Sequence, residues 1–101
     1  MKIFCFDLDN TLCHTNGTDY ANAKPIIKRI IKVNQLFDEG NIIKLLTARG
    51  SETGTDWSDT TLSQLDIWGV KYHELKFGKP SADYYIDDRG ISDKDFDWNL
   101  N

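Results

Sequence analysis

Apolar and polar positions alternate along the chain in a way that predicts strands and helices in turn. Residues Lys2 to Leu8 are apolar on both alternating faces up to Asp7, which is typical of a central parallel strand covered on both sides. After a polar loop from Cys13 to Lys24, the apolar residues from Pro25 to Glu39 recur at helical spacing. Gly40 follows as a stop signal. The first half of the chain therefore predicts a strand, a loop and an amphipathic helix.

The second half continues this alternation. The pattern predicts a second strand over Ile42 to Leu46, and a Gly/Thr/Ser-rich loop from Arg49 to Thr55 follows it. Asp56 is the expected cap of a second helix that reaches Trp68 and is closed by Gly69. The residues of this helix that we expect to face inward are Leu62, Leu65 and Trp68.

Two further strands are predicted, over Val70 to Leu75 and over Asp83 to Ile86. The order β-α-β-α-β-β predicts one domain over residues 1–101, a small Rossmann-like α/β sandwich of three layers with a mostly parallel sheet. In the expected strand order 4-1-2-3, the link Lys76 to Ala82 crosses about 14 Å of sheet, and its seven residues reach up to about 25 Å. The acidic and aromatic tail, Gly90 to Asn101, is left unassigned.

Composition narrows the class of protein. The 101 residues are 40% hydrophobic and 28% charged, as in an ordinary globular domain. The net charge of -4, without a Lys/Arg block, disfavours nucleic acid as a partner. No signal peptide or membrane span fits the pattern. Cys5 and Cys13 form no metal-binding or redox motif, so we expect a protein of the reducing cytoplasm.

Side chains able to carry chemistry adjoin the predicted strands: most of them end a strand, and Lys79 precedes the fourth strand. Because the carboxyl ends of parallel strands meet at one edge of a sheet, these side chains should lie together. Carboxylates gathered there repel one another unless a cation lies among them, and oxygen ligands select Mg²⁺. A hydroxyl and an ammonium at the same edge supply donors for a phosphoryl group. The residues are Asp7 and Asp9 of DLDNT, Thr47 of LLTARG, Lys79 of FGKP, and Asp87 and Asp88 of YYIDDR.

In this order, the four segments resemble the motifs of the haloacid dehalogenase-like phosphatase superfamily, over the span from Phe4 to Asp88. The chain has no segment long enough for the cap domain of many relatives, so it looks capless. The TARG stretch, FGKP and YIDDR are similar to short capless proteins associated with capsule and lipopolysaccharide biosynthesis. The resemblance implies a Mg²⁺-dependent phosphomonoester hydrolase that acts on a small phosphorylated substrate, such as a sugar phosphate.

The resemblance also implies a role for each matching residue. Asp7 would be the nucleophile that forms an aspartyl-phosphate and also a metal ligand. Asp9 would be the acid/base, with its backbone carbonyl touching Mg²⁺. Thr47 would bind a phosphate oxygen, and Lys79 would neutralise charge. Asp88 would bind the metal directly and Asp87 would orient Lys79 or a metal-bound water, although these two roles could be exchanged. The backbone N–H groups expected to assist phosphate binding are those near Leu8, Asp9 and Ala48.

Several interpretations stay open. Candidate substrate contacts are Thr11, His14, Arg49, Glu52 and Thr53, although a solvated loop histidine and a surface arginine are ordinary alternatives. The YYIDDR ending also resembles nucleotidases and polynucleotide 3'-phosphatases. A non-catalytic phosphate-binding or scaffold module is a further alternative. A two-component receiver domain is disfavoured as an alternative, because such domains have their acidic pair early in the chain, whereas here the pair comes last. An open site could be completed by a second subunit in a homo-oligomer.

Overall fold

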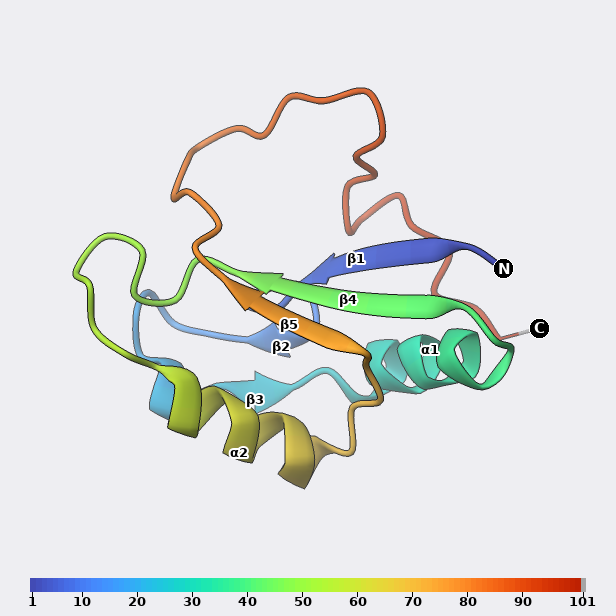
Figure 1. Ribbon diagram of the computed structural model, residues 1–101, viewed down its shortest axis with the longest axis horizontal. Coiled ribbons are helices and arrows are strands. Elements are labelled where there is room, and N and C mark those ends of the chain that lie inside the picture. The colour runs from blue at the N-terminus through green and yellow to red at the C-terminus, as the bar shows by residue number, and fades with distance from the viewer. Residues whose placement is uncertain (101) are drawn as a thin grey trace.

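The computed structural model describes residues 1–100. Its central feature is a three-stranded parallel sheet in the order β1-β4-β5, with two α-helices (Figure 1). No helix in this range is long and apolar enough to cross a membrane. The main elements in chain order are β1 (Ile3–Asp7), α1 (Ile27–Asp38), β4 (Ile42–Thr47), α2 (Ser58–Trp68) and β5 (Glu74–Phe77). The loop after β1 holds a small antiparallel pair, β2 (Cys13–His14) with β3 (Lys24–Pro25), and the 3-10 helix η1 (Tyr20–Asn22).

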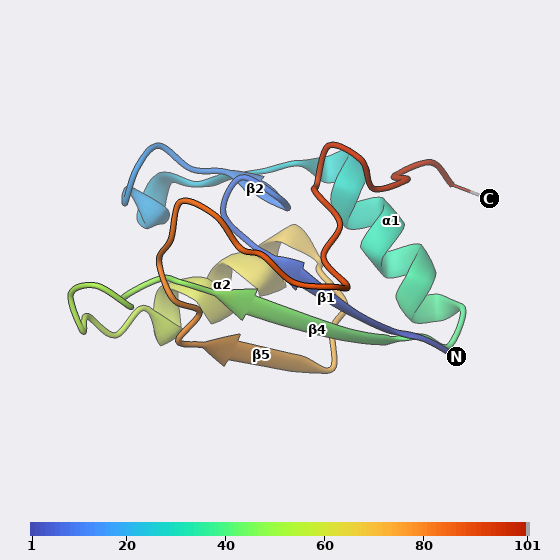
Figure 2. The same ribbon diagram turned by 90° about the horizontal axis from the view of Figure 1, so that it is seen from above.

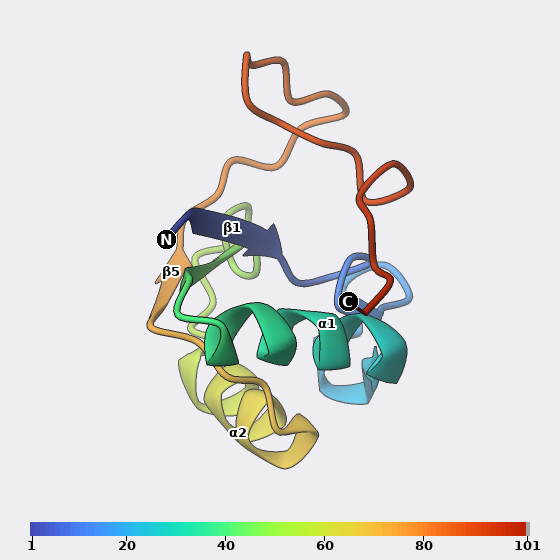
Figure 3. The ribbon, with the colours of Figure 1, turned by 90° about the vertical axis from the view of Figure 1, so that its right-hand side faces the viewer.

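Both helices lie on the same face of the sheet, as Figure 3 shows from its end. Each helix joins two neighbouring parallel strands, and both connections step in the same direction, from β1 to β4 and from β4 to β5. Parallel crossovers are right-handed in nearly all proteins, so two steps in one direction place both helices on one side. The α/β class with a parallel sheet is confirmed, but the expected third layer is wrong: the sheet has one helical layer.

The predicted fourth strand does not form, so the expected strand order 4-1-2-3 is wrong. Residues 83–86 belong to a long segment, residues 80–92, in which every residue is exposed. This segment, which we call the arch, leaves the end of β5, passes outside β1 and returns beside its amino end (Figure 1). Since β5 extends through Phe77, the link before Asp83 is shorter than the seven residues expected. β1 is consequently an edge strand.

The buried face of the sheet forms the core with α1 and α2. Its buried side chains include Leu45 of β4 and Phe6 of β1. On the opposite face Ile3 is 60% exposed, Cys5 is exposed, and an ion pair joins β4 to β5. The expectation that β1 is covered on both sides is therefore wrong, because no second helical layer exists to cover it.

The tail after the arch returns to the body of the protein. Phe96 and Trp98 pack against Phe6, with ring centroids 5.6 and 5.8 Å away. Asp93 forms an ion pair of 2.9 Å with Arg29 of α1. Figure 2 shows this part of the chain running beside α1. The tail thus closes the core at the edge of the sheet that an additional element would otherwise cover.

The boundaries of the first helix and the third strand differ from the sequence prediction. α1 begins at Ile27 rather than Pro25, because Pro25 pairs with Cys13 in the small antiparallel pair. β5 begins at Glu74 rather than Val70. Val70 instead packs into the core directly after α2, where its N–H bonds Leu65 O at 3.0 Å.

The second helix begins two residues after its expected cap. α2 starts at Ser58, and Asp56 Oδ1 accepts a hydrogen bond from the Ser58 N–H at 2.9 Å. The helix ends at Trp68, as predicted. Gly69 follows with φ 70°, a left-handed conformation that glycine adopts without strain.

Of the residues expected to face inward on α2, Leu65 is 1% exposed, whereas Leu62 is 48% exposed. Leu65→Ala should therefore lower the free energy of unfolding by about 2–5 kcal/mol, because it leaves a cavity in the core. Leu62→Ala removes the same atoms from the same helix and should cost at most about 1 kcal/mol. Urea unfolding of both variants measures the difference, and similar losses would contradict this orientation of α2.

Candidate functional site

Asp7 ends β1 at the carboxyl edge of the sheet. Its side chain is 32% exposed, and the Lys79 ammonium lies 3.6 Å from its Oδ1. Partial burial raises the pKa of Asp7 above its ordinary value, while the Lys79 ammonium and a hydrogen bond from the Leu8 N–H act in the opposite direction and Asp9 adds to the rise. The result is a carboxylate that is partly desolvated, accessible and faced by one cation.

The turn after Asp7 winds around a single carbonyl oxygen. Leu8 O accepts hydrogen bonds from the N–H groups of Thr11, Leu12 and Cys13 at 3.0, 2.8 and 3.3 Å. Asn10 adopts a positive φ of 62°, which asparagine tolerates better than most residues. This tight turn directs Asp9 inward, away from the strand end. The DLDNT segment thus separates its two carboxylates into different surroundings.

Asp9 is held by a bidentate ion pair with Arg49. Arg49 Nε donates to Asp9 Oδ2 at 3.0 Å, and Arg49 Nη2 donates to Oδ1 at 2.9 Å. The Thr15 hydroxyl also donates to Oδ1, at 2.5 Å. Such a fork fixes the orientation of the carboxylate as well as its position. Both oxygens of Asp9 therefore already have hydrogen-bond donors.

Arg49 is enclosed by the protein: its side chain is 0% exposed. Nη1 donates to Thr61 Oγ1 at 3.0 Å and to Gln64 Oε1 at 2.6 Å, both on α2. Its guanidinium also lies 5.0 Å from the centroid of the Tyr20 ring. The sequence suggested Arg49 as a substrate contact that could hold an anion bidentately. In the structure, the anion that it holds is the carboxylate of Asp9.

Thr47 and Lys79 are joined through the backbone. Thr47 O accepts a hydrogen bond from the Lys79 N–H at 3.1 Å, which fixes Lys79 at the end of β4. The Thr47 side chain points to the buried face, is 0% exposed, and accepts the Arg49 N–H at 3.1 Å. The structure therefore brings Lys79 to Asp7, whereas the Thr47 hydroxyl shapes the turn that leads into Arg49.

The acidic pair after the predicted fourth strand lies in the arch. Asp87 Oδ1 accepts hydrogen bonds from the N–H groups of Arg89, at 2.7 Å, and of Gly90. These two bonds hold the pKa of Asp87 below its ordinary value. Asp88 has a side chain 89% exposed, and its ion-pair partner is Arg89, with Nε at 3.9 Å. The arch, which holds both residues, projects away from the sheet whose first strand ends at Asp7 (Figure 3).

The Mg²⁺ site that the sequence predicted depends on these positions. Among residues 1–100, no three His, Cys, Asp or Glu side chains are close enough together to hold a metal ion. The Asp9 side chain is occupied by Arg49, which does not involve the Asp9 backbone carbonyl that was expected to touch Mg²⁺. Asp87 and Asp88 lie in the arch. Within residues 1–100, one chain in this conformation therefore does not gather the carboxylates that a resident Mg²⁺ requires.

The predicted substrate contacts lie around the site without forming one cluster. Thr11 is partly buried, and its carbonyl oxygen accepts a hydrogen bond from Arg29 at 3.0 Å. His14 is exposed in β2. Glu52 and Thr53 are exposed in the loop after Arg49. The structure therefore leaves His14, Glu52 and Thr53 open to solvent and uses the Thr11 backbone within the fold.

Other residues near the site have roles within the fold. Ala48 O accepts the Ser51 N–H at 2.9 Å in the turn after β4. The pattern missed Thr15, Thr61 and Gln64, which complete the Asp9–Arg49 network. Thr15 lies in the loop after β1, and Thr61 and Gln64 lie on α2. Nothing in the sequence pattern indicates that polar side chains from these elements converge on one arginine.

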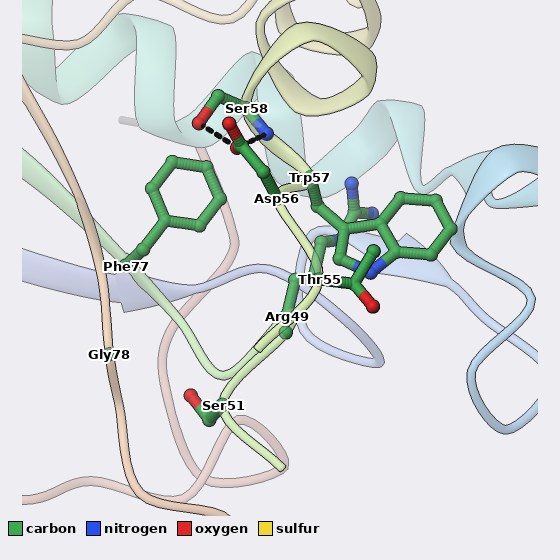
Figure 4. Close-up of a pocket in the computed structure, with 9 residues that line it drawn as sticks. Arg49, Ser51, Thr55, Asp56, Trp57, Ser58, Phe77 and Gly78 are labelled. Carbon is green, nitrogen blue, oxygen red and sulfur yellow. Dashed lines mark hydrogen bonds between the residues drawn. The ribbon is translucent and has the colours of Figure 1, made fainter. Parts of the chain in front are cut away.

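A cavity of about 230 Å³ opens beside the site, between β5 and the loop that leads to α2 (Figure 4). Phe77 stands on one side of it and Trp57 on the other, and Asp56 and Ser58 form hydrogen bonds at its rim. The cavity reaches Gly78, which adjoins Lys79. Its lining is polar and aromatic: Arg49, Gly50, Ser51, Thr55, Asp56, Trp57, Ser58, Phe77 and Gly78.

The fold and the site define a small parallel α/β protein with an acidic residue and a lysine paired at the carboxyl edge of its sheet. The chain is similar to an MCSG target from Vibrio cholerae of known crystal structure, with 30% sequence identity and a TM-score of 0.83. The similarity covers 93% of this chain and 85% of the Vibrio chain. The chain therefore belongs to the same family as that protein. No protein-family model and no curated protein sequence matches it.

The Asp9–Arg49 pair makes a prediction about stability. Arg49→Met should lower the free energy of unfolding by about 1.5–3 kcal/mol, because it strands a partly buried carboxylate and removes the donors to Thr61 and Gln64. The matched control is Arg89→Met, since the Arg89 side chain is 92% exposed and its loss should be within about 0.5 kcal/mol. Chemical denaturation measures both, and equal values would disprove a structural role for Arg49.

Proposed function

We propose that this protein is a phosphomonoester hydrolase of the haloacid dehalogenase-like superfamily, with Asp7 as its nucleophile. The observation that carries the proposal is the Asp7–Lys79 pair: a partly desolvated carboxylate at the end of a parallel strand, with an ammonium 3.6 Å away. In open α/β sheets, ligands bind at this edge. The ordered DLDNT, Thr47, Lys79 and Asp87–Asp88 segments support the same assignment.

The proposed reaction divides a difficult displacement into two steps. An Asp7 carboxylate oxygen attacks phosphorus and the bond between phosphorus and the ester oxygen breaks, so that an aspartyl-phosphate forms and an alcohol leaves after taking a proton. Water then attacks the aspartyl-phosphate, releasing inorganic phosphate and restoring Asp7. Lys79 supplies positive charge where the phosphoryl oxygens lie. Burial, which raises the pKa of Asp7, favours attack because a partly desolvated carboxylate has shed some of its water shell.

In this proposal Asp9 transfers the protons and Arg49 positions it. The fork from Arg49 fixes the plane of the Asp9 carboxylate, and the Thr15 hydroxyl fixes Oδ1. Asp9 can exchange a proton with the substrate or with water when one of these donors withdraws. Arg49 is thus a positioning residue, and its burial explains how it can hold one orientation.

Mg²⁺ is the cofactor of the proposed class, where it balances the charge of carboxylates and phosphate. One chain in this conformation does not gather the carboxylates that Mg²⁺ requires within residues 1–100. The steps above therefore use only the protein's own side chains. Any further carboxylates at Asp7 have to come from an element outside the core of one chain.

A sugar phosphate from a polysaccharide pathway is the substrate class that we propose. The cavity next to Lys79 has aromatic walls, Trp57 and Phe77, and hydroxyls from Ser51 and Thr55. Its volume of about 230 Å³ lies below the range of about 300–1,000 Å³ typical of larger ligands, which favours a single small ring. The chain's net charge of -4 disfavours a polyanionic oligonucleotide.

Asp7→Asn should abolish phosphatase turnover, because an amide does not attack phosphorus. Asp9→Asn should retain a trace, since loss of proton transfer alone typically costs about 10²- to 10⁴-fold. Release of inorganic phosphate from p-nitrophenyl phosphate and sugar phosphates measures both, with Asp66→Asn, an exposed residue of α2, as the matched control. Equal residual activity of the Asp7 and Asp9 variants would refute these roles, and an inactive native protein would refute the function.

Thermal unfolding of the Asp7→Asn variant verifies that its fold is intact. The pKa of Asp7 is raised in the folded protein, so the folded state binds this proton more tightly than the unfolded state. Ionisation of Asp7 therefore lowers stability as the pH rises through its folded pKa. The Asn variant should unfold at the same or a higher temperature than the native protein at neutral pH, and any advantage should vanish in acid. A variant that unfolds well below the native protein at neutral pH would contradict this.

Substrate preference provides a separate prediction. A sugar phosphate should show a higher kcat/KM than a nucleotide or a 3'-phosphorylated oligonucleotide, because the cavity suits one ring and the sequence has no basic block. Trp57→Ala should lower kcat/KM for the sugar phosphate more than for p-nitrophenyl phosphate. A panel of phosphorylated metabolites measures the ranking. A preference for nucleotides would contradict the sugar-phosphate proposal and favour a nucleotidase or polynucleotide 3'-phosphatase.

A further inference from the structure

Residues 84–86 of the arch are β-prone, but most of the arch lies away from the rest of its own chain. Tyr84, Tyr85 and Ile86 are 83%, 51% and 95% exposed, and Ile91 is 65% exposed. Tyr85 folds back on the base of the arch, where its hydroxyl donates to Pro80 O and its ring centroid lies 4.2 Å from Lys79 Nζ. A run of exposed β-prone residues of this kind is typical of a segment that pairs with another chain.

The arch is fastened at both ends to its own subunit. Before it, the Lys79 N–H bonds Thr47 O at 3.1 Å. After it, Asp93 pairs with Arg29, and the tail continues to Phe96 in the core. Between these points it projects well away from the sheet (Figure 3). The exposed residues therefore lie on an outward loop and not on a loose terminus.

The edge of β1 is the complementary unpaired element. β1 pairs on one side with β4 and has no strand on the other within residues 1–100. In doubly wound sheets the ligand crevice lies where the strand order reverses. In this protein the strand order would reverse between β1 and a strand added at its free edge. The crevice would therefore lie at the carboxyl end of β1, next to Asp7.

The arch cannot supply this strand to its own β1 with the acidic pair at Asp7. Asp7 is level with Leu46 at the end of β1, and Thr47 lies one residue further along. To place Asp87 level with Asp7 in a parallel strand, Asp83 must lie level with the start of β1, about 16 Å back along the sheet and about 10 Å across it from the end of β4. The direct distance is about 19 Å. The four residue steps from Lys79 to Asp83 reach only about 14 Å when fully extended.

An antiparallel run of the arch along its own β1 fails for a different reason. It would carry Asp87 and Asp88 toward the amino end of β1, at the opposite end of the strand from Asp7. Neither direction within one chain brings the acidic pair to the site while Lys79 stays at Thr47.

We propose that the arch of one copy of this chain adds residues 83–86 as a parallel strand to β1 of a second copy, and thereby delivers Asp87 and Asp88 to the second copy's Asp7. The exchange is reciprocal, as expected for a two-fold dimer, and each of the two sites contains residues of both chains. The inference rests on the proposed function for its chemical meaning, because the imported carboxylates supply the oxygen ligands that a single chain lacks.

The register of this pairing matches the two faces of the sheet. With Asp87 level with Asp7, Tyr84 and Ile86 lie level with Phe4 and Phe6, on the side that faces the core. Neighbouring parallel residues point the same way, as the buried pair formed by Phe6 and its β4 neighbour shows. Phe96 and Trp98 of the tail already pack against Phe6 on that side. Tyr84 and Ile86, the two most exposed of the large apolar residues of the arch, would thus join an existing aromatic group.

Cysteine cross-linking tests the pairing without any assay of activity. In the proposed register Tyr85 lies level with Cys5 on the opposite face, so Tyr85→Cys should form a disulfide with Cys5 of a second copy and run as a dimer on a non-reducing gel. Adding Cys5→Ser to this variant should abolish the dimer. Mildly alkaline pH favours the reaction, because the thiolate is the form that reacts.

Two matched variants separate specific pairing from chance contact. Tyr84→Cys, whose side chain would lie on the other face of the sheet, should cross-link much more slowly than Tyr85→Cys. Ser63→Cys, exposed on α2, reports collisional cross-linking and should be equally slow.

Three outcomes of this experiment would overturn the proposal. The first is a disulfide within one chain between Cys5 and the cysteine introduced at position 85. The second is equal dimer formation by the Tyr84, Tyr85 and Ser63 variants. The third is sedimentation of the native protein as a monomer at the concentrations of the cross-linking. None of these outcomes depends on phosphatase activity, so they leave the proposed function to be judged by turnover.

Complementation then tests whether the shared site is the catalytic one. Asp7→Asn and Asp88→Asn should each be inactive alone. When the two are refolded together, about half of the dimers are mixed and each mixed dimer has one intact site, so activity should return to about a quarter of the native value. Absence of recovery with both variants folded would overturn the proposal. If the native protein is inactive but the Tyr85→Cys variant still cross-links as a dimer, the proposed function is refuted and the proposed strand pairing stands.

Discussion

Each of the two βαβ connections in this chain is constrained to be right-handed, and both step in the same direction across the sheet. The remaining architecture follows from this constraint. Both helices lie on one face, so the other face keeps its mixed apolar and charged character. Because no connection steps back past β1, this strand stays at the edge and Asp7 at its end remains partly accessible. The position of the candidate nucleophile thus follows from the strand order and from the handedness of the two connections.

The sequence was sufficient to predict features that depend on strand ends. Asp7 and Lys79 meet because Asp7 ends β1 and Lys79 follows β5 in one parallel sheet, although the pattern had placed Lys79 before a fourth strand. The apolar pattern located β1 and β4 within one residue at each end. The role of Arg49 was not predictable from the pattern, because it depends on the direction of a side chain. Arg49 turns inward only because acceptors from different parts of the chain, on Asp9 and on α2, converge on it.

The absent fourth strand illustrates a different limit. Residues 83–86 have β-prone side chains, but a strand also needs an edge within reach of the chain. The sequence pattern reported the first condition, and for the second it predicted a seven-residue link that was long enough to cross the sheet, which the structure does not bear out. Once β5 is seen to extend to Phe77 and Lys79 to be fixed at Thr47, the remaining residues are too few for the crossing. The expected third layer is missing for a related reason, since no helix follows β5 within residues 1–100 to cover the open face.

The Asp9–Arg49 network connects the core to the candidate site. A buried arginine with four acceptor atoms around it is costly to desolvate, and breaking its pair with Asp9 is strongly destabilising. The network therefore constrains the loop after β1 and α2 together. Asp7 has the opposite character, since it is partly exposed and its pKa is raised by burial. One carboxylate of DLDNT is thus fixed by the fold, and the other stays partly exposed with one cation beside it. A site built on this division needs its further charges from an element that the core does not hold, and the arch is the exposed acidic segment that lies outside the core.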